Sequence, residues 1–79
     1  MTNTINNRIL SEVVAERLTI LRKRVGLSQQ VFAELIEVHA STVVRYETGQ
    51  GKIQLDVMAR AARALDYAPS ELVAERFEI

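Results

Sequence analysis

The sequence predicts a compact all-α domain of five short helices, and three observations favour this fold class. Apolar residues recur at intervals of three and four, which is the period of an amphipathic helix. Only three glycines and one proline occur in 79 residues, too few for a turn-rich β-sandwich or barrel. The chain has no cysteine, which excludes disulfide frameworks, thiolate zinc sites and cysteine nucleophiles.

The first two helices follow from their apolar spacing and their capping residues. Apolar positions spaced by four, three and four predict a helix from the N-cap Ser11 to Gly26, which stops it. Ser28 is expected to cap the second helix, which breaks at Glu37 and Val38. The positions expected to face inward are Val14, Leu18, Leu21 and Val25, then Phe32, Leu35 and Ile36.

The remaining three helices are shorter and are separated by loop signals. A third helix is expected over residues 39–48, ended by Gly49 and followed by a loop. A fourth runs over about 54–65, and Pro69, suited to a first helical turn, opens the fifth. Val38 and Val43 are expected to face inward around the third helix. The inward positions of the fourth helix are predicted to be Leu55, Met58, Ala61, Ala62 and Leu65, and those of the fifth Leu72 and Val73.

The chain has room for one domain and carries its charge unevenly. We expect a flexible or partly helical extension over 1–10, the domain over 11–75 and an apolar extension over 76–79. Residues 17–63 hold eight basic and four acidic side chains, whereas residues 64–79 hold one basic and four acidic side chains. A basic middle favours a polyanion-binding surface, although a mixed solvated surface would look the same. No signal peptide or membrane span is visible, so we expect a cytoplasmic protein.

The segment 28–49 predicts a helix-turn-helix. Two short helices joined by so short a turn must cross steeply. The outer face of the second helix, read at spacings of four, consists of Ala40, Ser41, Val44, Arg45 and Thr48. Such a face suits the edges of bases in a major groove, because Arg45 can bridge guanine O6 and N7 while Ala40 and Val44 pack on thymine methyls.

These residues resemble an Xre/Cro-like helix-turn-helix domain, the lambda-repressor-like family of phage repressors and small bacterial regulators. The resemblance spans residues 18–73 and rests mainly on Gly-Leu-Ser-Gln at 26–29 and Arg-Tyr-Glu-x-Gly at 45–49. The resemblance implies a five-helix fold and a protein that binds double-stranded DNA and does not act as an enzyme. No cofactor or metal is implied, and His39 is the single histidine of the chain.

The resemblance also implies roles for individual residues. Bases would be read by Ala40, Ser41, Val44 and Arg45. Backbone phosphates would be contacted by Arg22, Gln29, His39, Thr48, Gly49 and Lys52. Arg22 and Glu47 match a pair that bridges the first and third helices, so Arg22 has a structural role with phosphate contact as the alternative.

Some positions depart from the family pattern. Glu37 stands where glycine is usual, so a positive φ there would be strained. His39 is a weak cap for the third helix, and it is either an exposed residue without special duty or a phosphate contact. Ile53 replaces a frequent proline, and Asp66 replaces a frequent glycine.

A single short recognition helix reads few base pairs, so we expect a two-fold homodimer on half-sites about one helical turn apart. The expected dimer residues are Tyr67, Leu72, Phe77 and Ile79. Leu72 could instead close the core, and Phe77 could fill a local groove. A second candidate patch consists of Ile5, Ile9 and Leu10.

The function predicted is a sequence-specific regulator, a repressor that occupies a palindromic operator. The alternative is an antitoxin or anti-factor whose main partner is a protein, such as a toxin, with DNA binding as autoregulation. An enzyme is disfavoured because only His39, Ser41 and scattered carboxylates could form a site.

Overall fold

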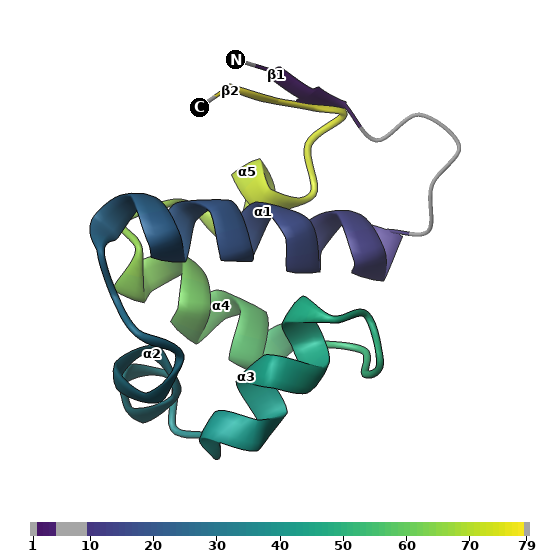
Figure 1. Cartoon of the computed structure of the whole chain (residues 1–79). Helices are drawn as coiled ribbons and strands as arrows, with labels where there is room; N and C mark the ends of the chain where they lie inside the picture. Colours follow the sequence, from purple (N-terminus) through teal and green to yellow (C-terminus); the bar gives the residue numbers. More distant parts are fainter. Residues whose placement is uncertain (1, 5–9, 79) are drawn as a thin grey trace.

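The computed structural model describes residues 2–4 and 10–78. The five predicted helices are present, together with one two-stranded sheet (Figure 1). In chain order the elements are β1 (Thr2–Thr4), α1 (Leu10–Val25), α2 (Gln29–Leu35), α3 (Ala40–Glu47), α4 (Leu55–Ala64), α5 (Pro69–Leu72) and β2 (Arg76–Glu78). The all-α class is therefore confirmed for the body of the chain.

The predicted helix ends are close to those observed. α1 begins one residue before Ser11, which therefore lies in its first turn and is not its cap. Gly26, at φ 88°, ends α1 by donating its N–H to the Arg22 and Lys23 carbonyls at 3.1 Å. Ser28 caps α2, because the Val31 N–H donates to its Oγ at 3.1 Å.

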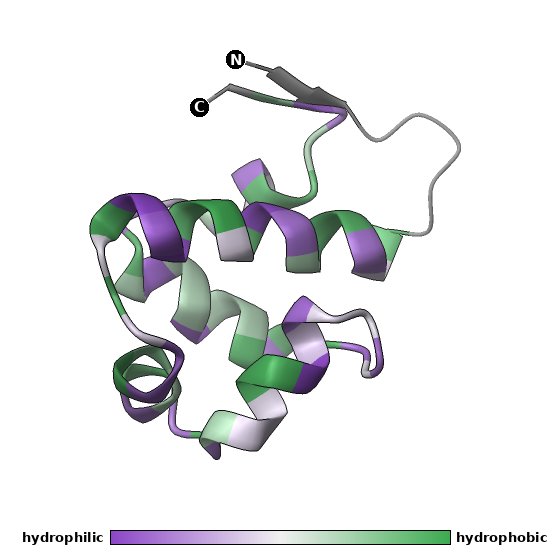
Figure 2. Cartoon of the chain, viewed as in Figure 1, coloured by the Kyte–Doolittle hydropathy of each residue, from purple (hydrophilic) through white to green (hydrophobic). Residues whose placement is uncertain are grey.

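The core lies where α1 and α4 cover the pair α2 and α3. Apolar and polar residues mix along each helix, as the green and purple segments of Figure 2 show, and the apolar ones turn inward. The most deeply buried apolar side chains, each at most 2% exposed, are Val13, Val14, Leu21, Phe32, Ala33, Ile36, Val43, Ala61, Ala62, Leu72 and Phe77.

Three apolar side chains expected to face inward are exposed instead. Val25 is 55% exposed, Leu35 is 52% exposed and Leu55 is 75% exposed. Each lies in the first or last turn of its helix, where the neighbouring helices do not cover it. Val57, which the apolar spacing did not place inward, is buried in α4.

The turn between α2 and α3 adopts the conformation that the sequence predicted to be strained. Glu37 has φ 62°, in the left-handed region where a side chain is unfavourable. Arg60 of α4 supports this turn: its Nε donates to the Ile36 carbonyl at 3.0 Å and lies 3.7 Å from the Glu37 carboxylate. Asp66, which also replaces a glycine, has φ 62° as well.

Both ends of the chain differ from the sequence prediction. Thr2–Thr4 pairs antiparallel with Arg76–Glu78, in the register Thr2 to Glu78 (Figure 1). A loose or helical start and an apolar tail were expected. Local patterns could not predict this pairing, because its two strands lie at opposite ends of the sequence. Ile5 and Ile9 fall outside the described residues.

Buried Arg17 holds the C-terminal segment against α1. It is fully buried, and its Nη1 donates to the Leu72 carbonyl at 2.9 Å and to the Ala74 carbonyl at 2.7 Å. Its Cζ also lies 5.2 Å from the centre of the Phe77 ring, which is a cation–π contact. The segment after α5 is therefore part of the folded domain.

Candidate nucleic-acid interface

The outer face of α3 presents the five side chains that the sequence placed there. Val43, on the opposite side, is 1% exposed and anchors α3 in the core. All members of the outer face are exposed: Ala40, Ser41, Val44, Arg45 and Thr48. The apolar side chain of Val44, which is 40% exposed, and the guanidinium of Arg45 both suit the edges of bases.

Thr48 uses its hydroxyl proton within the helix. Its Oγ1 donates to the Val44 carbonyl at 2.8 Å, with a longer contact of 3.3 Å to the Arg45 carbonyl. A phosphate accepts hydrogen bonds and does not donate them, so Thr48 has no free proton to offer in this conformation.

A carboxylate at the end of α3 joins three parts of the fold. Arg22 of α1 donates its Nε to Glu47 Oε2 at 2.6 Å and its Nη2 to Oε1 at 3.0 Å. The Arg22 Nη1 donates to the Leu27 carbonyl at 2.7 Å. The side chains of Arg22 and Glu47 are 9% and 8% exposed. This arrangement favours the structural role of Arg22 over contact with phosphate.

Gln29 belongs to the same network, which sequence reasoning did not predict. Its Nε2 donates to Glu47 Oε1 at 3.0 Å. The amide has a second hydrogen, so this bond fixes the orientation of Gln29 and still leaves a donor. No sequence signal identifies this contact, because Gln29 and Glu47 are 18 residues apart on different helices.

The other expected phosphate contacts lie at the two ends of α3. His39 is the N-cap of α3, is exposed and makes no side-chain capping bond, as its weak capping ability predicted. Gly49, at φ 77°, ends α3, and exposed Lys52 follows in the loop. These residues flank the outer face of α3.

Comparison with known proteins decides the family. Residues 13–75 match a family model described as a helix-turn-helix domain. The chain belongs to this helix-turn-helix family. Its similarity to Xre/Cro-like regulators, predicted from 26–29 and 45–49, is thereby confirmed, and the domain is of the DNA-binding, transcription-regulator type.

Similar proteins agree with this membership. A Pyrococcus furiosus protein, assigned by its name to the HTH-type transcriptional regulatory proteins, is 39% identical over 51 residues. That match covers 65% of this chain and 16% of the relative. The restriction-modification controller protein C.AhdI of Aeromonas hydrophila is 37% identical, with a TM-score of 0.73 over 78% of this chain and 94% of that one.

The P22 c2 repressor, solved in complex with a synthetic operator, shows the same fold. Its TM-score is 0.73 over 80% of this chain and 96% of that one. At 17% identity it supports the architecture of the helix-turn-helix domain and not its individual contacts.

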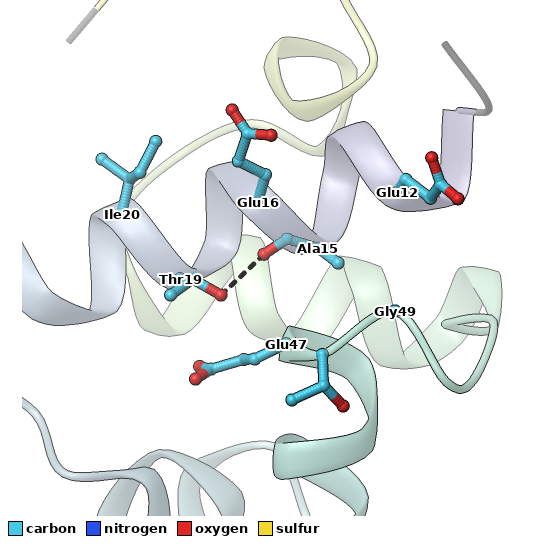
Figure 3. A pocket seen from close by; sticks show the side chains of 8 residues that line it. Glu12, Ala15, Glu16, Thr19, Ile20, Glu47 and Gly49 are labelled. Carbon is cyan, nitrogen blue, oxygen red and sulfur yellow. Dashed lines mark hydrogen bonds between the residues drawn. The ribbon is translucent and has the colours of Figure 1, made fainter.

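An acidic pocket borders the C-terminal end of α3 in the helix-turn-helix domain. It has a volume of about 410 Å³ and lies between α1 and the end of α3 (Figure 3). Its lining includes Glu12, Glu16 and Glu47 and no basic side chain. Glu47 is already paired with Arg22, so the remaining acidic lining comes from Glu12 and Glu16, and it is the α1 side of the pocket that is unsuited to face a DNA backbone.

The structure corrects the dimer contacts expected at the C-terminal end. Leu72 is fully buried and Phe77 is 2% exposed, so both belong to the core of the single chain. Phe77 fills a local site against Arg17, and Tyr67 is half-buried with its ring centre 5.5 Å from that of Phe77. Ile79 lies outside the described residues.

Neither a metal site nor a membrane-spanning helix occurs in the described part of the chain. Among residues 2–4 and 10–78, no three His, Asp or Glu side chains gather to hold a metal ion. In the same residues, no helix has the length and apolar character to cross a bilayer.

Proposed function

We propose that this helix-turn-helix protein is a cytoplasmic, sequence-specific regulator that represses transcription by occupying a palindromic operator as a homodimer. The observation that carries the proposal is the exposed outer face of α3, which presents one guanidinium, two apolar side chains and two hydroxyls on a helix anchored by Val43. A major groove is wide enough to admit such a helix.

Within this proposal, specificity comes from α3. Arg45 would bind guanine O6 and N7, Ala40 and Val44 would contact thymine methyls, and Ser41 would bond to a base edge. Phosphate contacts would come from Gln29, Lys52 and the backbone at Gly49, with His39 at the other end of α3. Thr48 and Arg22 are less suited, because their donors are engaged within the protein.

The relatives support a regulatory role. The Pyrococcus furiosus relative and C.AhdI carry regulatory names, and the P22 c2 repressor was solved on an operator. Because this chain spans 16% of the Pyrococcus furiosus protein, the activity of that whole protein is not transferred. No catalytic function is proposed.

The antitoxin alternative receives less support from the fold. It relied on the acidic residues Glu71, Glu75 and Glu78 together with apolar Phe77 and Ile79, and Phe77 is buried. A toxin partner would therefore have to bind without the Phe77 side chain.

The test is selection of binding sites from a random duplex library at near-physiological salt, where non-specific phosphate binding is suppressed. The proposal expects a palindrome whose half-sites lie about 10 bp apart. Lack of enrichment would contradict sequence-specific binding, and capture of a protein partner would then favour the antitoxin alternative.

A further inference from the structure

The loop after α3 turns back along the last turn of that helix. Gly49, at φ 77°, donates its N–H to the Tyr46 carbonyl at 3.2 Å, and Gln50 donates its N–H to the Arg45 carbonyl at 2.9 Å. These two bonds form a Schellman motif, in which the chain reverses at a left-handed residue. The motif brings the next residue, Gly51, beside the side chains of Arg45 and Tyr46.

The backbone conformation at Gly51 does not require glycine. Its φ lies outside the left-handed region, unlike those of Gly26 and Gly49. Residues that carry a side chain can therefore adopt the same backbone conformation. The lack of a side chain at Gly51 matters instead for the space beside it.

This space is bounded by two consecutive residues of α3. A Cβ atom placed on Gly51 would lie 3.8 Å from Arg45 Nη2, 3.9 Å from Arg45 Cβ and 3.8 Å from Tyr46 Cδ1. The Arg45 side chain therefore lies alongside Gly51 both at its base and at its guanidinium. All three distances are ordinary van der Waals contacts, so a single methyl group fits. A branched side chain has no further room on these two sides.

The two neighbours of Gly51 differ in their freedom to move. Tyr46 is half-buried and packs against the core, so its ring cannot shift without disturbing close-packed side chains. Arg45 is exposed and forms no side-chain hydrogen bond or ion pair with the described residues. A side chain at position 51 that is larger than a methyl group would therefore displace the guanidinium of Arg45.

The position of the guanidinium matters for the reading of a base. Guanine O6 and N7 are bound together only by a guanidinium whose two donors point at them in one plane. Val43 and Glu47 hold α3 in the fold, so the helix itself does not follow a displaced side chain. Displacement at position 51 then changes the contact made by Arg45 and leaves the rest of the outer face in place.

We propose that Gly51 is a positioning residue for Arg45. The space beside Gly51 lets the guanidinium lie along the loop, and this placement sets the base pair that Arg45 reads. The inference rests on the proposed function, which assigns base reading to Arg45. It adds a determinant of specificity that lies outside α3.

The first experiment examines the full chain without DNA by nuclear magnetic resonance. Nuclear Overhauser contacts should join the Gly51 Hα protons to the Hδ and Hε protons of Arg45, because the guanidinium lies beside Gly51. In Gly51→Ala the new methyl group should show the same contacts. Their absence in the wild type would overturn the proposal, whatever the protein binds.

The second experiment compares two enlargements of Gly51 on the selected operator and its single-base variants. Gly51→Val places two branches on Cβ and should weaken operator binding about tenfold, with the loss of preference confined to the base pair that Arg45→Ala also affects. Gly51→Ala is the matched control and should stay within about twofold of the wild type, because a methyl group fits. Equal effects of the two variants, or an equal loss on every duplex, would overturn the proposal.

A double-mutant cycle separates displacement of Arg45 from other effects of the added side chain. In the Arg45→Ala background, Gly51→Val should weaken binding by less than about twofold, because no guanidinium remains to be displaced. Gly51→Leu should repeat this pattern as a second enlargement. A tenfold loss in both backgrounds would show that the new side chain acts on DNA or on the fold directly, and would overturn the proposal.

The duplex selection separates this inference from the proposed function. A wild-type chain that selects no duplex contradicts the proposed function, and the role of Gly51 in specificity falls with it. A selected operator whose base preference is unchanged by Gly51→Val and Gly51→Leu contradicts the inference alone and leaves sequence-specific binding standing.

Discussion

At the residue scale, a few polar contacts decide what each side chain of the interface can offer. Glu47 accepts from Arg22 and from Gln29, so the arginine is engaged while the amide is oriented with one hydrogen left. Thr48 donates to its own helix. Arg45 forms no side-chain hydrogen bond or ion pair with the described residues, so its guanidinium is available to a base.

Replacing Arg45 tests the assignment of base reading. We expect Arg45→Ala to weaken binding to the selected operator by about 1–3 kcal/mol and to relax preference at one base pair, because a bidentate contact to guanine is lost. The measurement is binding to the operator and to single-base variants. Arg24→Ala, an exposed arginine on the last turn of α1, serves as the control. An equal loss on every duplex would identify Arg45 as a phosphate contact.

Replacing Glu37 tests the strain in the turn. Because Glu37 has φ 62°, replacing it by glycine removes a penalty of about 1–2 kcal/mol for a side chain in the left-handed conformation. Glycine also raises the conformational entropy of the unfolded chain, which offsets part of this gain. We expect Glu37→Gly to raise the free energy of unfolding by about 0.5–1 kcal/mol. Thermal and urea unfolding measure this. In the last turn of α2, where the backbone is helical, Glu34→Gly should instead lose up to about 1 kcal/mol, and a loss at both positions would refute the strain.

At the element scale, the structure joins segments that the sequence leaves separate. α1 contacts the end of α3 through Arg22 and the C-terminal segment through Arg17. These two buried arginines lie five residues apart on one helix and face different partners. α1 therefore holds both the end of α3 and the C-terminal segment in place.

Replacing Arg17 tests the attachment of the C-terminal segment. Arg17→Met keeps much of the side-chain volume but removes the donor to the Leu72 and Ala74 carbonyls. We expect a loss of about 2–4 kcal/mol in the free energy of unfolding, because charged hydrogen bonds are broken and buried carbonyls are left without a donor.

The control for this substitution is Arg24→Met on the same helix, which is exposed and should change stability by less than about 0.5 kcal/mol. Hydrogen exchange adds a local reading, since the amides of β2 should lose protection in the Arg17 variant before those of α3 do. Similar small losses in the two variants would show that the carbonyls find other donors.

At the scale of the whole molecule, a formal net charge of zero conceals the features that suit DNA. Basic residues predominate over 17–63, whereas the acidic pocket lies beside α1 and the end of α3. Binding then depends on where charge lies and not on its total. Electrostatic attraction to phosphate should be moderate and strongly weakened by salt.

Salt dependence separates charged from neutral phosphate contacts. We expect Lys52→Ala to reduce the slope of log affinity against log salt by about 1, because one fewer counterion is released. Gln29→Ala should weaken binding on all sequences without changing the slope, since its amide is uncharged. A sequence-dependent loss for Gln29→Ala, or an unchanged slope for Lys52→Ala, would contradict these two assignments.

The sequence by itself determined the helical fold, the caps at Ser28 and Gly26 and the outer face of α3. These features are local: they depend on spacing within one helix, on a capping side chain or on one backbone conformation. The positive φ at Glu37 and the pairing of Arg22 with Glu47 followed through the family resemblance.

Only the tertiary structure decided which apolar side chains remain exposed and how the ends of the chain are held. Leu55 and Leu35 fit a helical stripe but lie in terminal turns that no neighbour covers, whereas Phe77 lies in a short strand and is buried against Arg17. Burial depends on what other elements contribute at a point in space, so a single helical period cannot supply it. The bond from Gln29 to Glu47 and the pairing of β1 with β2 are long-range for the same reason.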